Sequence, residues 1–415
     1  MKTRSALVIS LWYSLGVVML LLVLFGAWAG VRLSRSTSAS RSVLVTADNA
    51  LVRYMPPPLR DTGDPKPLLD ALEHSIRYYR QLSPHAQKRF GKDSVPVSTI
   101  IETLEDVRSR LQIDGFSPAF FEYLAEHYLF YKTSAERTLV TGYYEAEVEG
   151  SYVPDSSYRF PLYAPPTDLV RLREPAVSLR VGDAAPERVG RLTESGQIVP
   201  FYDRRQIDDD GVLRGRGLEL VYLKDPIARF FLQVQGSGTI RLPNGESVRV
   251  GFAAKNGLPY RPIGRLLIER GILAAEQVTM QSIRTYLEQH PDEQREIFAY
   301  NESYVFFRFV EEGPIGSIGV PVTPYRTIAT DARIFPNGAL AFLITDLPTT
   351  SATGAPTRNK RSFSGLVVNQ DTGDAIRGPG RVDLFTGRGA VNESVAGRMR
   401  ESGVLYFLLK KRVER

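Results

Sequence analysis

Three stretches in the first third of the chain carry apolar residues at the i, i+3, i+4 spacing of an amphipathic helix, and we predict a helix at each. The third stretch is preceded by Ser117 and Pro118, which suit the N-cap and the first helical position. We interpret the aromatic residues of these helices as core rather than as part of a site. The apolar positions are Leu68, Leu69, Leu72, Ile76 and Leu82; Ile100, Ile101, Leu104, Val107 and Leu111; and Phe121, Leu124, Tyr128 and Tyr131.

The pattern turns to strands at Leu139, and frequent Pro and Gly break the runs between residues 150 and 260. Helical spacing returns over residues 263 to 273, closed by Gly271, and over residues 277 to 289. The strands that follow are SYVFFRF, YRTIATD, LAFLIT, FSGLVV, VDLF and VLYFLLK. The pattern alone predicts an α+β fold, mainly β, in which a β-rich body frames an inserted segment of strands and two helices.

Near the N-terminus, residues 6 to 31 hold no charged side chain and are numerous enough to span a bilayer. A small-residue sequence at positions 27 to 29 would also suit signal cleavage, but the length favours an uncleaved transmembrane anchor. Residues 33 to 67 are rich in Ser and then in Pro and Gly, which is typical of a spacer. We therefore predict a membrane-tethered protein.

Composition excludes several classes of function. The chain has 415 residues, 43% of them hydrophobic, which predicts two or three folded domains. Its net charge of +6 is spread without a long basic block, so we predict no nucleic-acid partner. Cysteine is absent, which excludes disulfides and an acylated cysteine. The four histidines show no metal-ligand spacing and no nucleotide-binding loop occurs, so we predict neither a metal nor a cofactor.

The most informative stretch is NQDTGDAIRGPGRVDLFTGRG, residues 369 to 389. Five glycines among three aspartates are typical of a turn, a short strand and a second turn. Within the strand, the period of two puts Val382 and Leu384 on one face and Arg381, Asp383 and Phe385 on the other. The first face suits a core and the second a cleft.

This stretch resembles the C-terminal three-aspartate domain of the membrane-bound lytic transglycosylase A family. The resemblance continues in TGYYEAEVEGS, FFLQVQGSG, NGLPYRPIGRLLIERG, NESYVFFR and PYRTIATDARIFPNG, and so runs from about residue 138 to the C-terminus. It implies a double-psi β-barrel with an inserted smaller β-barrel domain, behind a helical N-terminal segment and one transmembrane helix. The implied boundaries are 1–32 for the anchor or signal, 33–67 for the linker, 68–150 plus 311–415 for the catalytic barrel and 151–310 for the insert.

The resemblance also implies an activity: cleavage of the β-1,4 bond between N-acetylmuramic acid and N-acetylglucosamine in peptidoglycan, with formation of a 1,6-anhydro end. One carboxyl group can protonate the bridging oxygen and then accept the proton of the attacking C6 hydroxyl. The resemblance assigns that role to Asp383, with Asp371 and Asp331 supporting the site. The residues predicted to bind substrate are Thr141, Tyr143, Tyr144, Gln233, Gln235, Ser237, Arg381 and Phe385.

Two details of the motif carry further expectations. Asp383 has to be protonated when substrate arrives, which Asp371 nearby would favour and Arg381 would oppose. We therefore expect Arg381 to turn away from Asp383. Asp374 stands where relatives have the second glycine of DTGG, and it is either a tolerated turn residue or a third acid that tunes Asp383.

Two other classes of function stay open. The sequence Asp371-Thr372-Gly373 is also the signature of aspartic proteases, although no second copy occurs in this chain. The protein would instead be a non-catalytic, membrane-tethered glycan-binding protein if Asp383 did not face a groove. For the transglycosylase, we expect glycan strands as the partner, and the envelope of a Gram-negative bacterium as the location, with the catalytic body in the periplasm.

Overall fold

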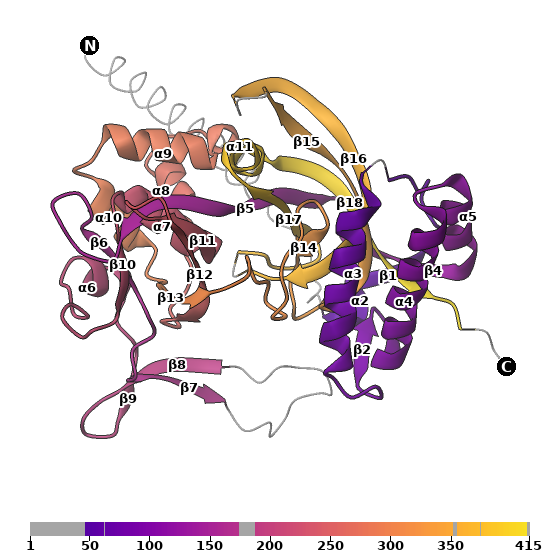
Figure 1. Ribbon diagram of the computed structural model, residues 1–415, viewed down its shortest axis with the longest axis horizontal. Helices are drawn as coiled ribbons and strands as arrows, with labels where there is room; N and C mark the ends of the chain where they lie inside the picture. The colour runs from indigo at the N-terminus through magenta and orange to yellow at the C-terminus, as the bar shows by residue number, and fades with distance from the viewer. Residues whose placement is uncertain (1–45, 62, 174–186, 352–354, 374, 413–415) are drawn as a thin grey trace, which may run out of the picture. The chain divides into compact units, whose positions relative to one another are not determined.

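A computed structural model describes residues 46–61, 63–173, 187–351, 355–373 and 375–412 (Figure 1). The predicted transmembrane segment and Asp374 lie outside these residues. Within them, no helix combines the length and the apolar character needed to cross a membrane.

The three predicted helices are present as α3 (Pro65–Arg80), α4 (Val97–Asp114) and α5 (Pro118–His127). Ser117 caps α5 as predicted, because its side chain accepts a hydrogen bond from the backbone N–H of Phe120 at 3.2 Å. The third helix was predicted too long. It ends at His127, and the aromatic run that follows pairs with strands on both of its sides, so tertiary pairing outweighs the helical spacing there.

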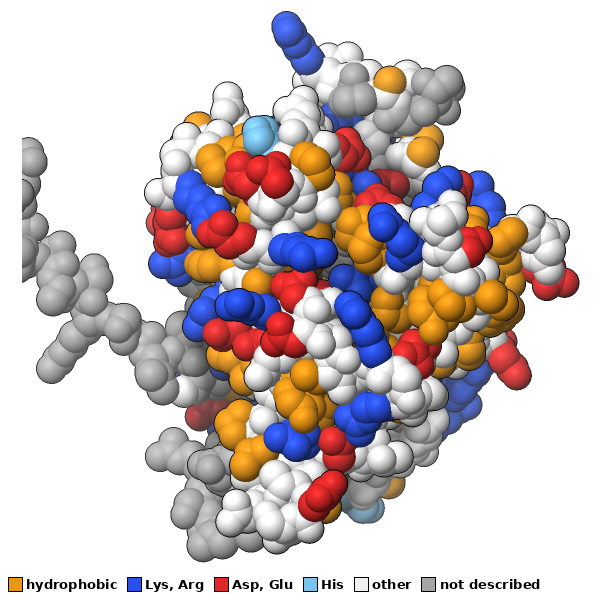
Figure 2. Space-filling model, turned by 90° about the vertical axis from the view of Figure 1, so that its left-hand side faces the viewer, with side chains coloured by type: hydrophobic (Ala, Val, Ile, Leu, Met, Phe, Trp, Pro, Cys, Tyr) orange, Lys and Arg blue, Asp and Glu red, His pale blue; other side chains and the backbone are white. Residues whose placement is uncertain are grey.

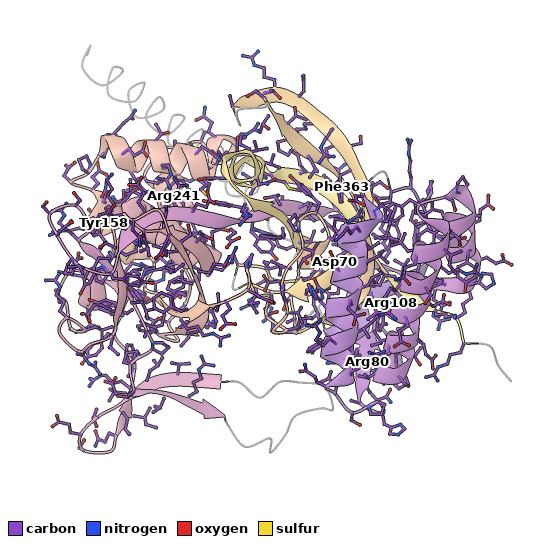
Figure 3. The ribbon with its side chains drawn as sticks, viewed as in Figure 1. Asp70, Arg80, Arg108, Tyr158, Arg241 and Phe363 are labelled. Carbon is purple, nitrogen blue, oxygen red and sulfur yellow. The ribbon has the colours of Figure 1, made fainter. Side chains whose placement is uncertain are left out.

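Apolar faces of these helices form the main core with the sheet: α3 packs on β16 (Pro356–Asp371) and α4 on β18 (Arg400–Lys410). Their outer faces are joined by ion pairs. Arg80 on α3 pairs with Glu105 on α4 at 2.6 Å, and Arg108 on α4 pairs with Glu73 on α3. Figure 3 labels Arg80 and Arg108 on the two helices. Such exposed pairs contribute little free energy, so burial of the inner faces holds the helices in place.

Most strands belong to one mixed sheet of 13 strands. Its main path runs β1-β4-β18-β15-β16-β14-β17-β5-β11-β12-β13, and β10 and β6 branch from β5. Pairing is antiparallel except at β14–β16, β17–β5 and β11–β5. The bounds not yet given are β1 (Leu51–Tyr54), β4 (Tyr128–Thr133), β5 (Thr138–Ser151), β6 (Phe160–Tyr163), β10 (Glu219–Leu223), β11 (Ser237–Arg241), β12 (Ser247–Lys255), β13 (Val305–Val310), β14 (Thr327–Ala329), β15 (Leu340–Thr350) and β17 (Arg381–Arg388).

Smaller elements complete the described residues. They are α2 (Ala47–Ala50), the hairpin of β2 (Gln87–Phe90) and β3 (Asp93–Pro96), and a separate sheet of β7 (Leu169–Arg173), β8 (Glu187–Leu192) and β9 (Ile198–Val199).

The predicted fold class, a double-psi β-barrel with a separate inserted β-barrel, is wrong. The described strands form a mixed sheet with helices, and the long strand β5 belongs to both regions that we had assigned to different barrels. Its first half pairs with β17 and β18, and its second half continues into pairing with β11 and β10. The sequence pattern shows where strands occur, but it does not show that one strand of 14 residues serves two regions.

The inserted segment holds more helix than predicted. The two expected helices are α8 (Ile263–Glu269), followed by Gly271 at φ +71°, and α9 (Met280–Gln289). Three others were missed: α6 (Arg204–Asp208), α7 (Pro226–Gln235) and α10 (Gln294–Tyr300). Figure 2 faces this segment and shows acidic and basic side chains interleaved over its surface.

Outside the insert, α11 (Ala390–Arg398), between β17 and β18, was also missed. The signals of α7 were present in the sequence. Asp225 caps it, Pro226 takes the first position and Gly236 ends it at φ +77°.

Candidate functional site

Four strands place one residue each in a row across one face of the sheet. Ala329 on β14 is paired with Asp371 on β16 and with Asp383 on β17, and Asp383 is paired with Thr141 on β5. Neighbouring strands lie about 4.8 Å apart, so the Cα atoms of the two aspartates are about 10 Å apart. Ala329 is the residue of β14 that lies between the two aspartates in this row. The row therefore brings together two of the three predicted catalytic aspartates.

A β-bulge in β16 puts Asp371 into this row. Ile328 is paired with Asn369 but Ala329 is paired with Asp371, which leaves Gln370 as the extra residue. Without it, Asp371 would point to the opposite face, because side chains alternate along a strand. The Gln370 side chain is fully buried and donates hydrogen bonds to the carbonyl of Ala71 at 2.7 Å and to a serine on α3. The helical segment thus fixes the bulge.

Asp383 has the strand alternation that the sequence predicted, with Val382 and Leu384 fully buried on the core side. Its Oδ1 accepts hydrogen bonds from the Thr141 hydroxyl and from Arg381 Nε, the latter at 3.3 Å. Arg381 Nη2 also donates to Thr141 Oγ1 at 3.1 Å. The expectation that Arg381 turns away from Asp383 is wrong, because the two residues stand two apart on β17 and therefore share a face.

Only one oxygen of Asp383 is engaged. Both donors bind Oδ1, and in the described residues Oδ2 has no hydrogen-bond or ion-pair partner. The side chain is 18% exposed. The carboxyl group is therefore held in orientation through one oxygen while the other can meet a ligand.

Asp371 is the carboxyl group of the row with the perturbed pKa. Burial raises the pKa to about 6, and the nearby charge of Asp383 adds to the rise. The backbone N–H groups of Thr372 and Ser317 oppose it, donating to Oδ1 at 2.8 and 2.9 Å. Asp371 thus changes protonation state within the physiological range.

Tyr143 and Phe385 are paired with each other, two residues beyond the pair of Thr141 and Asp383 in the same parallel strands, and so lie on the same face. Their ring centroids are 5.1 Å apart. The Tyr143 hydroxyl is buried and close enough to Asp371 to stabilise its carboxylate, but the approach lacks hydrogen-bond geometry. Burial and the two carboxylates raise the pKa of Tyr143, so its hydroxyl stays neutral.

Asp331 has a different environment. It is fully buried and accepts hydrogen bonds from Arg333 Nε at 2.8 Å and Nη2 at 2.6 Å. Burial by itself would raise the pKa of Asp331, but the bonds from Arg333 and from the N–H of Gly378 lower it overall. Because Gly378 lies in the loop between Asp371 and Arg381, Asp331 holds that loop. The structure shows no direct bond between Asp331 and either carboxyl group of the row, in the residues it describes.

Three predicted substrate-binding residues, Tyr144, Gln235 and Ser237, lie together where β5 meets the inserted segment, and a fourth, Gln233, lies apart from them. The Tyr144 hydroxyl donates to Glu393 on α11 at 3.2 Å, and its backbone N–H donates to the half-buried Gln235 at 3.3 Å. Ser237 begins β11, next to the end of α7. Gln233 is buried, with its side-chain oxygen bound by Arg204, and does not join this group.

No pattern in the sequence singles out Ala329, Ser317 or Glu393, which the structure adds to the surroundings of the site. Ala329 is recognisable in hindsight, since it stands two residues before Asp331 in the alternating run YRTIATD. Ser317 contributes only its backbone, which no side-chain pattern reports. Across the described ranges, no group of three or more His, Asp or Glu side chains is arranged to hold a metal ion.

Two family models match the chain: the MltA specific insert domain over residues 139–308 and the 3D domain over residues 326–409. The membrane-bound lytic murein transglycosylase A of Vibrio cholerae is 28% identical over 278 residues, 65% of each chain. This chain thus spans about 65% of the length of that curated relative.

Solved structures of the same family are also similar to this chain. A membrane-bound lytic murein transglycosylase from Agrobacterium tumefaciens is 33% identical, with a TM-score of 0.70 over 84% of this chain and 93% of its own. MltA from Neisseria gonorrhoeae is 26% identical, with a TM-score of 0.60 over 88% and 97%. These likenesses show that the chain belongs to the membrane-bound lytic murein transglycosylase A family.

Proposed function

We propose that this protein is a lytic transglycosylase that cleaves peptidoglycan between N-acetylmuramic acid and N-acetylglucosamine and leaves a 1,6-anhydromuramic acid end. The observation that carries the proposal is the environment of Asp383. One of its oxygens is fixed by Thr141 and Arg381, and the other is available on the face of the sheet away from the core. Membership of the family supports this assignment.

In the proposed reaction, protonated Asp383 gives its proton to the bridging oxygen as the bond from that oxygen to C1 of the muramic acid breaks. The C6 hydroxyl of the same sugar then forms a bond to C1 and loses its proton to the Asp383 carboxylate. The acid is regenerated and no water is consumed. Because both donors bind Oδ1, we assign the proton to Oδ2.

Asp371 supports this chemistry in the proposal. Its pKa of about 6 means that a fraction of the protein carries a proton on Asp371 at neutral pH. Thr141 and Arg381 position Asp383, while Tyr143, Tyr144, Phe385, Gln235 and Ser237 are proposed to contact sugar. Gln233 is proposed to act only through Arg204, because its side-chain oxygen is bound by that guanidinium group. Asp331 is proposed to keep the loop that ends in Arg381 in place.

An aspartic protease needs two carboxyl groups close enough to share one proton. Strand β14 separates Asp371 from Asp383, which disfavours that alternative. A non-catalytic glycan-binding protein would not need a carboxyl oxygen that is free to exchange a proton. We therefore keep the transglycosylase as the single proposed function.

The proposed division is an insert at 151–310 and a catalytic part made of 68–150 and 311–415, and the family models support two parts in that they match residues 139–308 and 326–409. Of the predicted linker at 33–67, residues Leu51–Tyr54 form β1 of the main sheet and Pro65 begins α3. The relatives are called membrane-bound, and we propose that this protein also belongs to the membrane and periplasm of a Gram-negative envelope. The uncharged N-terminal residues 6 to 31 are proposed to attach it.

Mass spectrometry of a murein digest tests the activity. Wild-type protein is expected to release fragments with 1,6-anhydro ends, which are one water lighter than hydrolysed fragments. Asp383→Asn keeps the size of the side chain but has no transferable acid proton, so release should fall by at least about 10²-fold while the protein stays folded. Reducing-end products would refute the mechanism, and undiminished release by Asp383→Asn would refute the residue.

A further inference from the structure

A cavity in the inserted segment is lined by an excess of arginine. It has a volume of about 370 Å³ and lies between β6, α6, α7 and α10. None of its lining residues belongs to the row around Asp383. We call it the arginine cavity, after the six arginines in its wall: Arg159, Arg204, Arg205, Arg214, Arg229 and Arg295.

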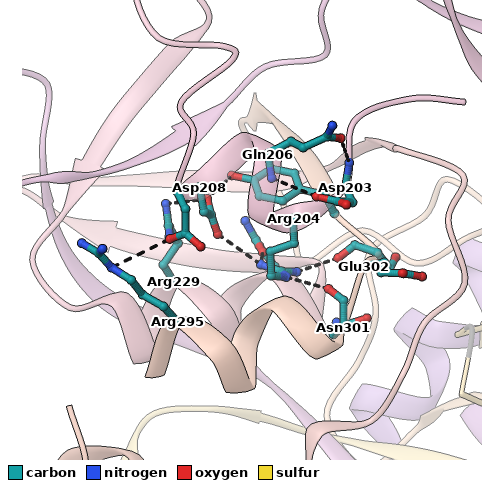
Figure 4. A network of polar contacts seen from close by, with 12 residues as sticks. Asp203, Arg204, Gln206, Asp208, Arg229, Arg295, Asn301 and Glu302 are labelled. Carbon is teal, nitrogen blue, oxygen red and sulfur yellow. Dashed lines mark hydrogen bonds and ion pairs between the residues drawn. The ribbon is translucent and has the colours of Figure 1, made fainter. Parts of the chain in front are cut away.

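Two of the arginines are buried and share one carboxylate. Arg204 and Arg229 are 2% and 7% exposed, and both pair with Asp208, at 3.6 and 2.9 Å (Figure 4). Arg204 also donates to the carbonyls of Asn301 and Ser303. Asp208 further accepts a hydrogen bond from a buried tyrosine at 3.2 Å. This carboxylate is therefore saturated, and the buried arginines form a fixed floor.

The other arginines line the cavity from exposed positions. Arg295 pairs loosely with Asp209 at 3.9 Å. Arg159, Arg205 and Arg214 have no carboxylate within 4.0 Å among the residues that the structure describes. Since Arg stays protonated at any physiological pH, the six guanidinium groups exceed the two carboxylates of the lining, Asp208 and Asp209, by four positive charges.

The remaining lining indicates what kind of anion would fit. Phe160, Phe298 and Ile207 contribute apolar surface, and a cavity of this size lies within the range of sites for small organic molecules. An inorganic ion would leave that apolar surface uncovered. Guanidinium groups match carboxylates in planar geometry and charge. The lining therefore fits an organic molecule that carries more than one carboxylate.

We propose that the arginine cavity binds the carboxylates of short acidic peptides. If the proposed function holds, the stem peptides of peptidoglycan supply that chemistry beside the glycan strand that Asp383 cleaves, and this part of the inference rests on it. The insert would then select peptide-bearing murein. Free acidic peptides are the other source of the same chemistry, and the experiment distinguishes the two.

Binding is measured first, by calorimetry of the purified protein with the dipeptide Ala-Glu and with its diamide. Saturable binding of Ala-Glu is expected, with the diamide at least about tenfold weaker. The double variant Arg205→Gln/Arg214→Gln should also bind about tenfold more weakly, whereas Arg241→Gln/Arg265→Gln should not change. The control removes two exposed arginines of the insert that lie outside the cavity. All four side chains are exposed, so the variants should fold, and circular dichroism checks this.

Equal binding of the diamide, or of the Arg205→Gln/Arg214→Gln variant, would overturn the proposal. Digestion of intact murein and of amidase-stripped glycan then identifies the source. If the Arg205→Gln/Arg214→Gln variant cleaves intact murein more slowly than wild type but cleaves stripped glycan at the same rate, stem peptides are the ligand. If the ratio of the two rates is the same as in wild type, free peptides are the ligand of the cavity. Because Asp383→Asn should still bind Ala-Glu, binding can be established even if no murein is cleaved. The experiments thereby distinguish a failure of the proposed transglycosylase function from a failure of the proposed peptide binding.

Discussion

Replacement of Asp371 by Asn should make the protein more stable at neutral pH and leave its stability unchanged in acid. The carboxyl group has a pKa of about 6 in the folded protein against an ordinary value of 3.8, and burial is the main cause. A difference of this size corresponds to about 3 kcal/mol between the two protonation states. Asparagine keeps an oxygen that can accept the hydrogen bonds from the backbone of Ser317 and Thr372.

The sign follows from which state binds the proton more tightly. Below pH 3.8 Asp371 is protonated in the folded and unfolded protein alike, so its stabilising contribution is fully present. As the pH rises towards 6 and beyond, the unfolded chain ionises without cost, while the folded protein has to bury a charge. Wild-type protein therefore loses up to about 3 kcal/mol of stability relative to Asp371→Asn over that window.

Urea unfolding followed by circular dichroism at pH 4 and pH 7.5 measures the difference. The free energy of unfolding of Asp371→Asn should exceed that of wild type by up to about 3 kcal/mol at pH 7.5, and the difference should nearly vanish at pH 4. Asp70→Asn on α3 is the matched control, because that carboxylate is mostly exposed. If Asp371→Asn is no more stable than wild type at pH 7.5, or if the difference in unfolding free energy is the same at both pH values, burial does not disfavour the charge of Asp371.

Other substitutions test the row and its support. In the pH profile of murein cleavage, Asp383→Asn should lose activity at every pH rather than shift the optimum, since it removes the transferred proton; a shifted profile with full activity would point to an indirect role. Ala329→Leu should lower cleavage at least about tenfold by filling the space between the carboxyl groups, at a stability cost of about 1–3 kcal/mol, whereas Ile328→Val on the core side of the same strand should leave turnover unchanged. Asp61→Ala leaves the buried Arg326 without its ion-pair partner and should lower the free energy of unfolding by about 3–5 kcal/mol. A loss below about 1 kcal/mol in urea unfolding would show that Asp61 does not compensate the buried charge of Arg326.

The sequence predicted local features well where neighbouring residues along the chain decide them. The alternation of Val382, Asp383 and Leu384 placed the carboxyl group opposite the core, because side chains of a strand point to alternate faces whatever the strand pairs with. The cap at Ser117 and the end of α8 near Gly271 were predictable for the same reason. Each depends on contacts within one turn of chain.

Features that depend on pairing between distant segments could not be predicted in this way. The periodicity of residues 128 to 131 fits a helix as well as a strand, and only the pairing of β4 with β1 and β18 decides between them. The direction of Arg381 depended on whether an acid elsewhere would attract its side chain. The fold class also failed, because nothing in the spacing of Thr138–Ser151 shows that one strand pairs with two regions.

By itself the sequence determined the turn, the strand and the aspartates of the site, and through its motif the family to which the chain belongs. Only the tertiary structure decided that Asp371 shares a face with Asp383, since this requires the extra residue Gln370 in β16, held from α3 through its side chain. A shift of one residue in a strand reverses every side chain that follows, and the register of a parallel pair is set by long-range packing. The sequence thus identifies the aspartates, whereas the register of the folded sheet places them on one face.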